Sequence, residues 1–111
     1  ATFAGTVSDS IGELRQIPSR SVSSVTLATS DGGKAILATS TVTVPNSTFS
    51  AGDAVTIINN SGSDITISKS ISTMYLASDG SSANRTLATR GMATIWFASG
   101  TVAYISGAGL S

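Results

Sequence analysis

The stretch Gly91-Met-Ala-Thr-Ile-Trp-Phe-Ala-Ser-Gly-Thr-Val-Ala-Tyr-Ile-Ser106 contains two runs of strand-forming residues around a Ser-Gly pair. A two-residue loop that ends in glycine is typical of a β-hairpin, because glycine adopts the positive φ that a tight turn requires. With Ser99-Gly100 as the loop, Ile95 lies opposite Tyr104, and Trp96 points to the other face. The stretch therefore predicts a closing hairpin that separates Trp96 from Tyr104.

A second hairpin is predicted between the runs at residues 54–59 and 64–68. If Asn60-Ser61-Gly62 is a three-residue loop, Gly62 takes the left-handed position that such loops require. The register then places four apolar side chains on one face of the pair. These are Val55, Ile57, Ile65 and Ile67.

The whole chain shows the same strand-and-turn alternation, and no segment has the pattern of a regular helix. Further strands are predicted at residues 22–27, 34–38, 41–44, 73–77 and 85–89, and no fixed repeat period is present. We expect an all-β fold, an antiparallel β-sandwich or jelly-roll-like barrel of about eight or nine short strands. Residues 21–111 form this domain in the prediction, and residues 1–20 precede it as an extended N-terminal arm.

The predicted arm contains apolar residues at intervals. The segment from Ile11 to Ile17 has helical spacing, but Gly12 and Pro18 bracket it too tightly for a stable helix. We interpret the apolar residues as anchors for a partner, and a frayed terminus is the alternative. Trp96 joins these interaction candidates because tryptophan is common at interfaces, with core packing as its alternative. The full set is Phe3, Val7, Ile11, Leu14, Ile17 and Trp96.

Composition limits the possible partners. Six basic and six acidic residues give a net charge of +0, and charged residues make up only 11% of the chain. Such a chain has no long-range attraction for nucleic acid or anionic membranes, and no apolar run is long enough to span a bilayer. With little charge to keep molecules apart, the protein is expected to work in an assembly.

Catalysis, metal binding and cofactor binding are not expected. The chain has no Cys, so it has no disulfide or thiolate metal site, and it has no His, which removes the commonest general base and metal ligand. A Ser-Lys pair with Lys34 or Lys69 is formally possible, but each Lys is better read as a solubilising residue. Four acids occur beside Gly-containing turns, where a calcium site is less expected than capping of the turn backbone. They are Asp31, Asp53, Asp64 and Asp79.

Several short motifs, together with their order along the chain, resemble a β-rich module of tailed-bacteriophage structural proteins. The resemblance covers roughly residues 22–110. It rests on Thr26–Lys34, Val42–Pro45, Phe49–Asn60, Ile65–Ile67, Asn84–Gly91 and the closing Ile105-Ser-Gly-Ala-Gly-Leu110. The module occurs in tail-fibre and head-decoration proteins, and it brings no catalytic residues to this chain.

The resemblance implies a structural protein of the virion. Because the module makes up nearly all of this sequence, a capsid decoration (cement) protein on the outer surface of the head is expected. The expected partners are the major capsid protein and further copies of the chain in a homotrimer. The alternative is a tail-fibre, knob or head-fibre module that recognises a host glycan or protein through loops 45–53 and 78–84.

Overall fold

The computed structural model describes residues 17–111, which form strands and one turn of 3-10 helix, Thr29–Asp31. The prediction of an all-β barrel or sandwich of about eight or nine strands is confirmed. The strands are β1 (Ser19–Val22), β2 (Val25–Thr26), β3 (Ala35–Ala38), β4 (Val42–Val44), β5 (Ala54–Asn59), β6 (Ile65–Lys69), β7 (Thr73–Leu76), β8 (Arg85–Phe97) and β9 (Val102–Leu110). β1 includes the last two residues of the predicted arm.

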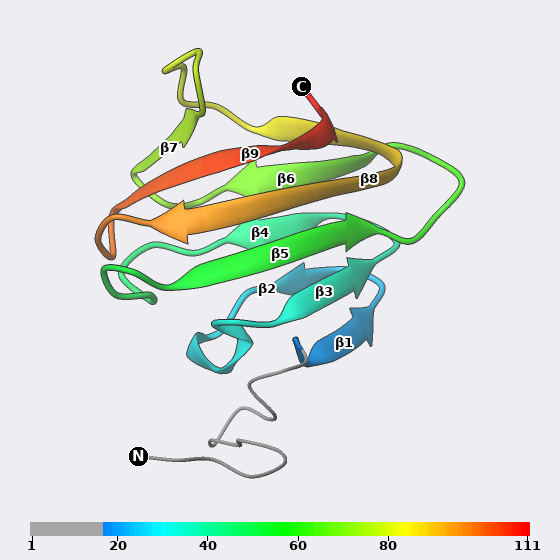
Figure 1. Ribbon diagram of the computed structural model, residues 1–111, viewed down its shortest axis with the longest axis horizontal. Coiled ribbons are helices and arrows are strands. Elements are labelled where there is room, and N and C mark those ends of the chain that lie inside the picture. The colour runs from blue at the N-terminus through cyan, green and yellow to red at the C-terminus, as the bar shows by residue number, and fades with distance from the viewer. Residues whose placement is uncertain (1–16) are drawn as a thin grey trace, which may run out of the picture.

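The first six strands alternate between two layers. β1, β3 and β5 pair side by side in parallel, and β2, β4 and β6 do the same in the other layer. Figure 1 shows β2 and β4 behind β3 and β5. Each circuit of the chain thus adds one strand to each layer, which builds a two-sided parallel stack.

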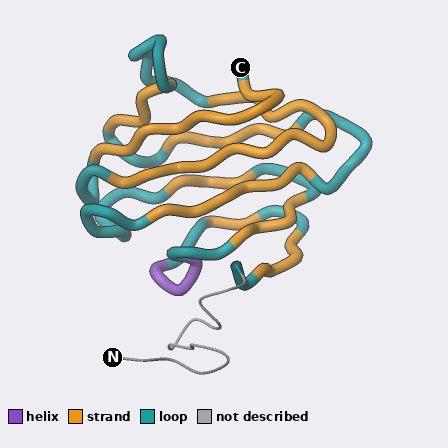
Figure 2. The backbone as a smooth tube through the Cα atoms, in the orientation of Figure 1, coloured by secondary structure: helices purple, strands orange, loops and turns teal. Residues whose placement is uncertain are grey.

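The last two long strands join the layers. Residues 85–87 of β8 pair with β6 in the rear layer, and residues 92–96 pair with β5 in the front layer. β9 runs antiparallel along β8 and also pairs in parallel with β7. The two layers therefore form one nearly closed, barrel-shaped sheet, visible as the continuous strands in Figure 2.

The strand directions differ from the antiparallel arrangement that we predicted. Antiparallel pairs occur where β8 meets β5, β6 and β9, whereas the other pairs are parallel. Parallel neighbours usually need a long crossover connection. Here the crossover is itself a strand of the opposite layer, so short connections suffice. Successive circuits of the chain differ in length: Ser19, Ala35 and Thr56 are register partners, but they are unequally spaced in the sequence. The sequence therefore shows no fixed repeat period, although the strands repeat in space.

The predicted hairpin at residues 54–68 is wrong as a pairing. β5 and β6 lie in opposite layers, and the segment 60–64 arches between them. Gly62 is not in the left-handed region. The shared face was nevertheless identified correctly, because Val55, Ile57, Ile65 and Ile67 are all buried in the interior. A similar arch at Ser23 and Ser24 divides the strand predicted at residues 22–27 into β1 and β2.

Alternate residues of both layers fill the core. Fully buried Ile36, Ile57, Ile95 and Ile105 lie on β3, β5, β8 and β9, and branched side chains of this kind pack well on pleated sheets. The rings of Phe49 and Phe97 stack with centroids 4.4 Å apart. This packing fixes which side chains of the front layer point away from the core.

Two buried polar side chains form hydrogen bonds that fix the segments between strands. The Asn59 amide donates to the carbonyls of Ser63, Leu87 and Ala88 at 2.8, 2.9 and 3.1 Å, which fixes the arch after β5 against β8. Near the β1 end, the Asp31 carboxylate accepts two hydrogen bonds from the Arg20 guanidinium, at 3.1 and 2.9 Å. Both side chains are fully buried, so these partners replace water.

Candidate binding face

The outward side chains of the front layer form one continuous face across β1, β3, β5, β8, β9 and β7. The strand registers arrange its centre in three rows that run across the strands. The aromatic row consists of Ala54, Trp96, Tyr104 and Tyr75. The hydroxyl row beside it consists of Thr56, Thr94 and Ser106, and the aliphatic row consists of Leu37, Ile58, Met92 and Ala108.

The aromatic row places three large rings on neighbouring strands. Trp96 lies directly opposite Tyr104, and these side chains are 48% and 45% exposed. The Tyr104 ring lies 5.3 Å from the Tyr75 ring, centroid to centroid, at an angle of 40°. Exposed rings in such a row offer a large, rigid contact area with a polar edge.

The shared face of Trp96 and Tyr104 corrects the predicted hairpin register. The hairpin itself is confirmed, but residues 98–101 form its loop and Phe97 pairs with Ala103. The loop packs on an earlier segment, because the Ser47 N–H donates to the Gly100 carbonyl at 2.7 Å. A one-residue change of register moves a side chain to the other face, so Tyr104 joins Trp96.

The outward side chains that make up the face are uncharged. None of the outward residues of β1, β3, β5, β7, β8 and β9 in the front layer is Asp, Glu, Lys or Arg. The rear layer instead presents hydroxyls, from Thr26, Thr43, Thr66, Ser68 and Thr86. Apart from Ile17, which precedes β1, the large exposed apolar side chains lie in the front layer, where Met92 is 51% exposed. Depletion of charge with enrichment of aromatic residues and Met is the composition of a protein-binding surface.

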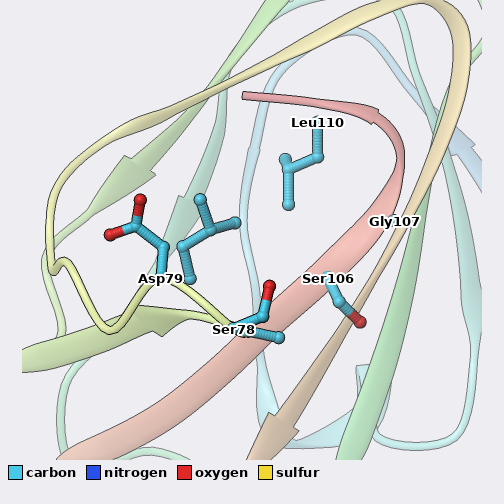
Figure 3. Close-up of a pocket in the computed structure, with 7 residues that line it drawn as sticks. Ser78, Asp79, Ser106, Gly107 and Leu110 are labelled. Carbon is cyan, nitrogen blue, oxygen red and sulfur yellow. The ribbon is translucent and has the colours of Figure 1, made fainter.

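A hollow of about 540 Å³ lies beside this face, between β9 and the loop that follows β7. Figure 3 shows Ser78 and Asp79 on the loop, with Gly107 and Leu110 across the hollow on β9. The hydroxyl and the backbone N–H of Ser81 lower the pKa of Asp79, and the N–H lies 3.0 Å from the Asp79 Oδ1. The loop that follows β7 thus stabilises the Asp79 carboxylate.

Three of the four acids flagged in the sequence cap turns as predicted. Asp31, Asp53 and Asp79 accept hydrogen bonds from the backbone N–H groups of Ala28, Ser50 and Ser81. In residues 17–111 no cluster of three or more His, Cys, Asp or Glu side chains has a geometry that could hold a metal ion.

The two arginines of β8 donate hydrogen bonds to loops of the same chain. Arg85 donates to the Ser81 hydroxyl at 3.1 Å, and Arg90 donates to the Asn60 side-chain carbonyl at 2.9 Å. These contacts tie the start and the bend of β8 to the loops beside them. The positive charges therefore lie at the margins of the sheet and not on the candidate face.

The predicted interaction residues divide into three groups. Phe3, Val7, Ile11 and Leu14 lie outside the residues that the structure describes. Ile17, the first described residue, is 69% exposed, and Trp96 is half-exposed on the candidate face. Trp96 therefore does not belong to the core, which was its alternative. Among the described residues, no helix has the length and apolar character to cross a membrane.

The comparisons with known proteins leave the chain without a family. No protein-family model matches it, and no curated protein matches it closely enough to be called a relative. The site is therefore defined by its geometry alone. Sequence reasoning missed Tyr104, Tyr75 and Met92, since their common face depends on the register of β8 and β9 and on the pairing of β7 with β9. The alternation within residues 91–106 was the available signal.

Proposed function

We propose that this protein is a structural component of a bacteriophage virion, most specifically a capsid decoration protein on the outer surface of the head. The observation that carries the proposal is the uncharged face with Trp96, Tyr104 and Met92 exposed at its centre. A surface of this composition binds another protein surface, and it contains no acid–base pair that could act on a substrate.

The resemblance to phage structural modules supports the same class, and the fold gives its motifs a physical role. The closing Ile105-Ser-Gly-Ala-Gly-Leu110 is most of β9, which passes from the front layer to the rear layer. The motif Asn84–Gly91 contains the bend of β8 that closes the barrel. These residues build a stable body, and the decorating role is assigned to its surfaces and to the arm.

In this proposal residues 1–17 attach the body to the major capsid protein, and weak contacts repeated over the shell add up to firm attachment. Deletion of residues 1–17 is expected to leave a folded domain, because the first strand begins at Ser19. The truncated protein should fail to bind particles that lack the protein, as measured by co-sedimentation. Binding of full strength by the truncated protein would contradict the role of the arm.

Location in the particle tests the proposal as a whole. Cryo-electron microscopy of purified particles, or antibody labelling, should show many copies spread over the head. A few copies at the tail would instead support a fibre or knob module. Absence from the virion would overturn the structural role altogether.

Glycan recognition is the second candidate, and one observation favours it. Aromatic rings in a row, beside a row of hydroxyls, suit the flat apolar faces and the polar edges of sugar rings. This candidate predicts saturable binding of the purified protein to particular oligosaccharides on a glycan array. Trp96→Ala should then abolish the signal, and Thr66→Ala in the rear layer should leave it unchanged.

A further inference from the structure

The three rows of the candidate face have an order that makes the face complementary to itself. The hydroxyl row lies in the middle, with the aromatic row on one side and the aliphatic row on the other. A rotation of 180° about an axis that runs along the hydroxyl row places one copy face to face with another. On β5, β8 and β9, the aromatic row of each copy then covers the aliphatic row of the other, and the hydroxyl rows meet.

The sizes of the side chains are complementary on β5 and on β9 in this arrangement. On β5, small Ala54 faces large Ile58 of the second copy, and on β9 large Tyr104 faces small Ala108. On β8, Trp96 faces Met92, a pair in which the thioether contacts the ring favourably. Large side chains thus meet small ones on two strands, and side chains that interdigitate in this way pack one sheet against another.

Charge supports a second copy as the occupant. Under two-fold symmetry a charged residue near the axis meets its own like charge, which disfavours the pairing. Thr94 lies at the centre of the face, and its hydroxyl is 3.4 Å from that of Thr56, so the axis passes over neutral groups. The half-exposed Trp96, Tyr104 and Met92 have no cover among residues 17–111, and pairing would bury all three in each copy.

We propose that two copies of this chain associate through the front face about a two-fold axis over Thr94. The inference does not rest on the proposed place in a virion. The resemblance suggests a homotrimer, whereas the order of the three rows fits a two-fold dimer, and we therefore propose the dimer. Closed two-fold dimers are also the commonest soluble oligomers.

Charge exchange at the axis tests the proposal. Thr94 is exposed, so Thr94→Lys and Thr94→Glu should fold normally, as circular dichroism can confirm. Sedimentation equilibrium should show the unaltered protein as a dimer and each variant alone as a monomer, with dimerisation weakened at least about tenfold by like charges at the axis. An equimolar mixture of the two variants should form the dimer again.

The rear layer provides the matched control. Thr66→Lys and Thr66→Glu place the same charges on an exposed strand residue of the hydroxyl-bearing layer, and dimerisation should be unchanged. A second readout uses the absence of cysteine from the chain. With a short bismaleimide, Thr94→Cys should give covalent dimers rapidly, and Thr66→Cys should not.

Four results would overturn the proposal. They are a monomer at every concentration tested, a trimer, a dimer that Thr94→Lys does not weaken, and a mixture of the charged variants that fails to pair. A monomer that binds particles normally would overturn the pairing while it leaves the virion role standing. If the protein forms the dimer in solution but is absent from virions, the pairing stands and the virion role is overturned.

Discussion

Asp31 shows how much one buried residue depends on its partner. Its carboxylate is fully buried and accepts hydrogen bonds from Arg20 and from the Ala28 N–H, 2.9 Å away. The Arg20 side chain is 39% exposed, so it closes the β1 end of the barrel and also meets solvent. A sequence prediction could assign Asp31 to a turn, but its ion pair depends on an arch that brings β1 beside the loop.

Arg20→Ala is expected to lower the free energy of unfolding by about 3 kcal/mol, because it leaves the Asp31 carboxylate buried without a counter-charge. Urea denaturation measures the change. The double variant Arg20→Met, Asp31→Asn should recover much of the loss, since a neutral amide still accepts the Ala28 N–H. Equal stability of the single variant and the unaltered protein would show that the pair contributes nothing.

Asp79 gives a prediction about pH. Hydrogen bonds from Ser81 stabilise the carboxylate and lower its pKa from 3.8. The stabilising contribution of the loop is thus present above pH 3.8 and is lost as the pH falls through the lowered pKa. In an NMR titration, Ser81→Ala should raise the pKa of Asp79 toward 3.8, and Ser82→Ala should leave it lowered. An unchanged pKa in Ser81→Ala would contradict the assignment.

At the scale of elements, β8 and β9 decide the architecture because each spans both layers. Their change of layer requires close approach of backbones. A Cβ on Gly107 would lie 2.0 Å from the Met92 carbonyl oxygen, and one on Gly91 would lie 2.9 Å from the Ala108 carbonyl oxygen. Gly91 and Gly107 are thus needed for space between the paired strands.

Gly107→Ala should lower the free energy of unfolding by about 3 kcal/mol, because the new methyl group meets backbone that cannot move without breaking the β8–β9 pairing. Thermal and chemical denaturation both report the change. Gly62→Ala is the matched control, since a Cβ at Gly62 meets nothing within 4 Å. If both variants lost the same stability, the space argument for Gly107 would be wrong.

Local patterns predicted most strands but not their partners. The runs at residues 54–59 and 64–68 alternate cleanly, and their inward side chains were identified correctly. The sequence of these two runs is equally compatible with a hairpin and with an arch, because both arrangements bury the same side chains. The choice is made by β8, which takes the places beside β5 and β6 that the hairpin would have filled. That contact is distant in sequence and leaves no local signal.

At the scale of the whole molecule, the two layers face outward with different chemistry. The rear layer presents threonine and serine hydroxyls, which water solvates well. The front layer presents Trp96, Tyr104 and Met92, and none of the outward residues of its strands is charged. The sequence shows low charge overall, but it does not show this asymmetry, because that depends on register across four strands. The asymmetry is why the front face is assigned to binding.

The front face is expected to be covered by a partner when the protein works. Trp96 is the only tryptophan, so its fluorescence reports on that face alone. Acrylamide quenching of Trp96 should be strong for the dilute protein, where the side chain is 48% exposed, and should fall steeply as the protein associates. Quenching that stays equally strong in the fully associated protein would contradict the account.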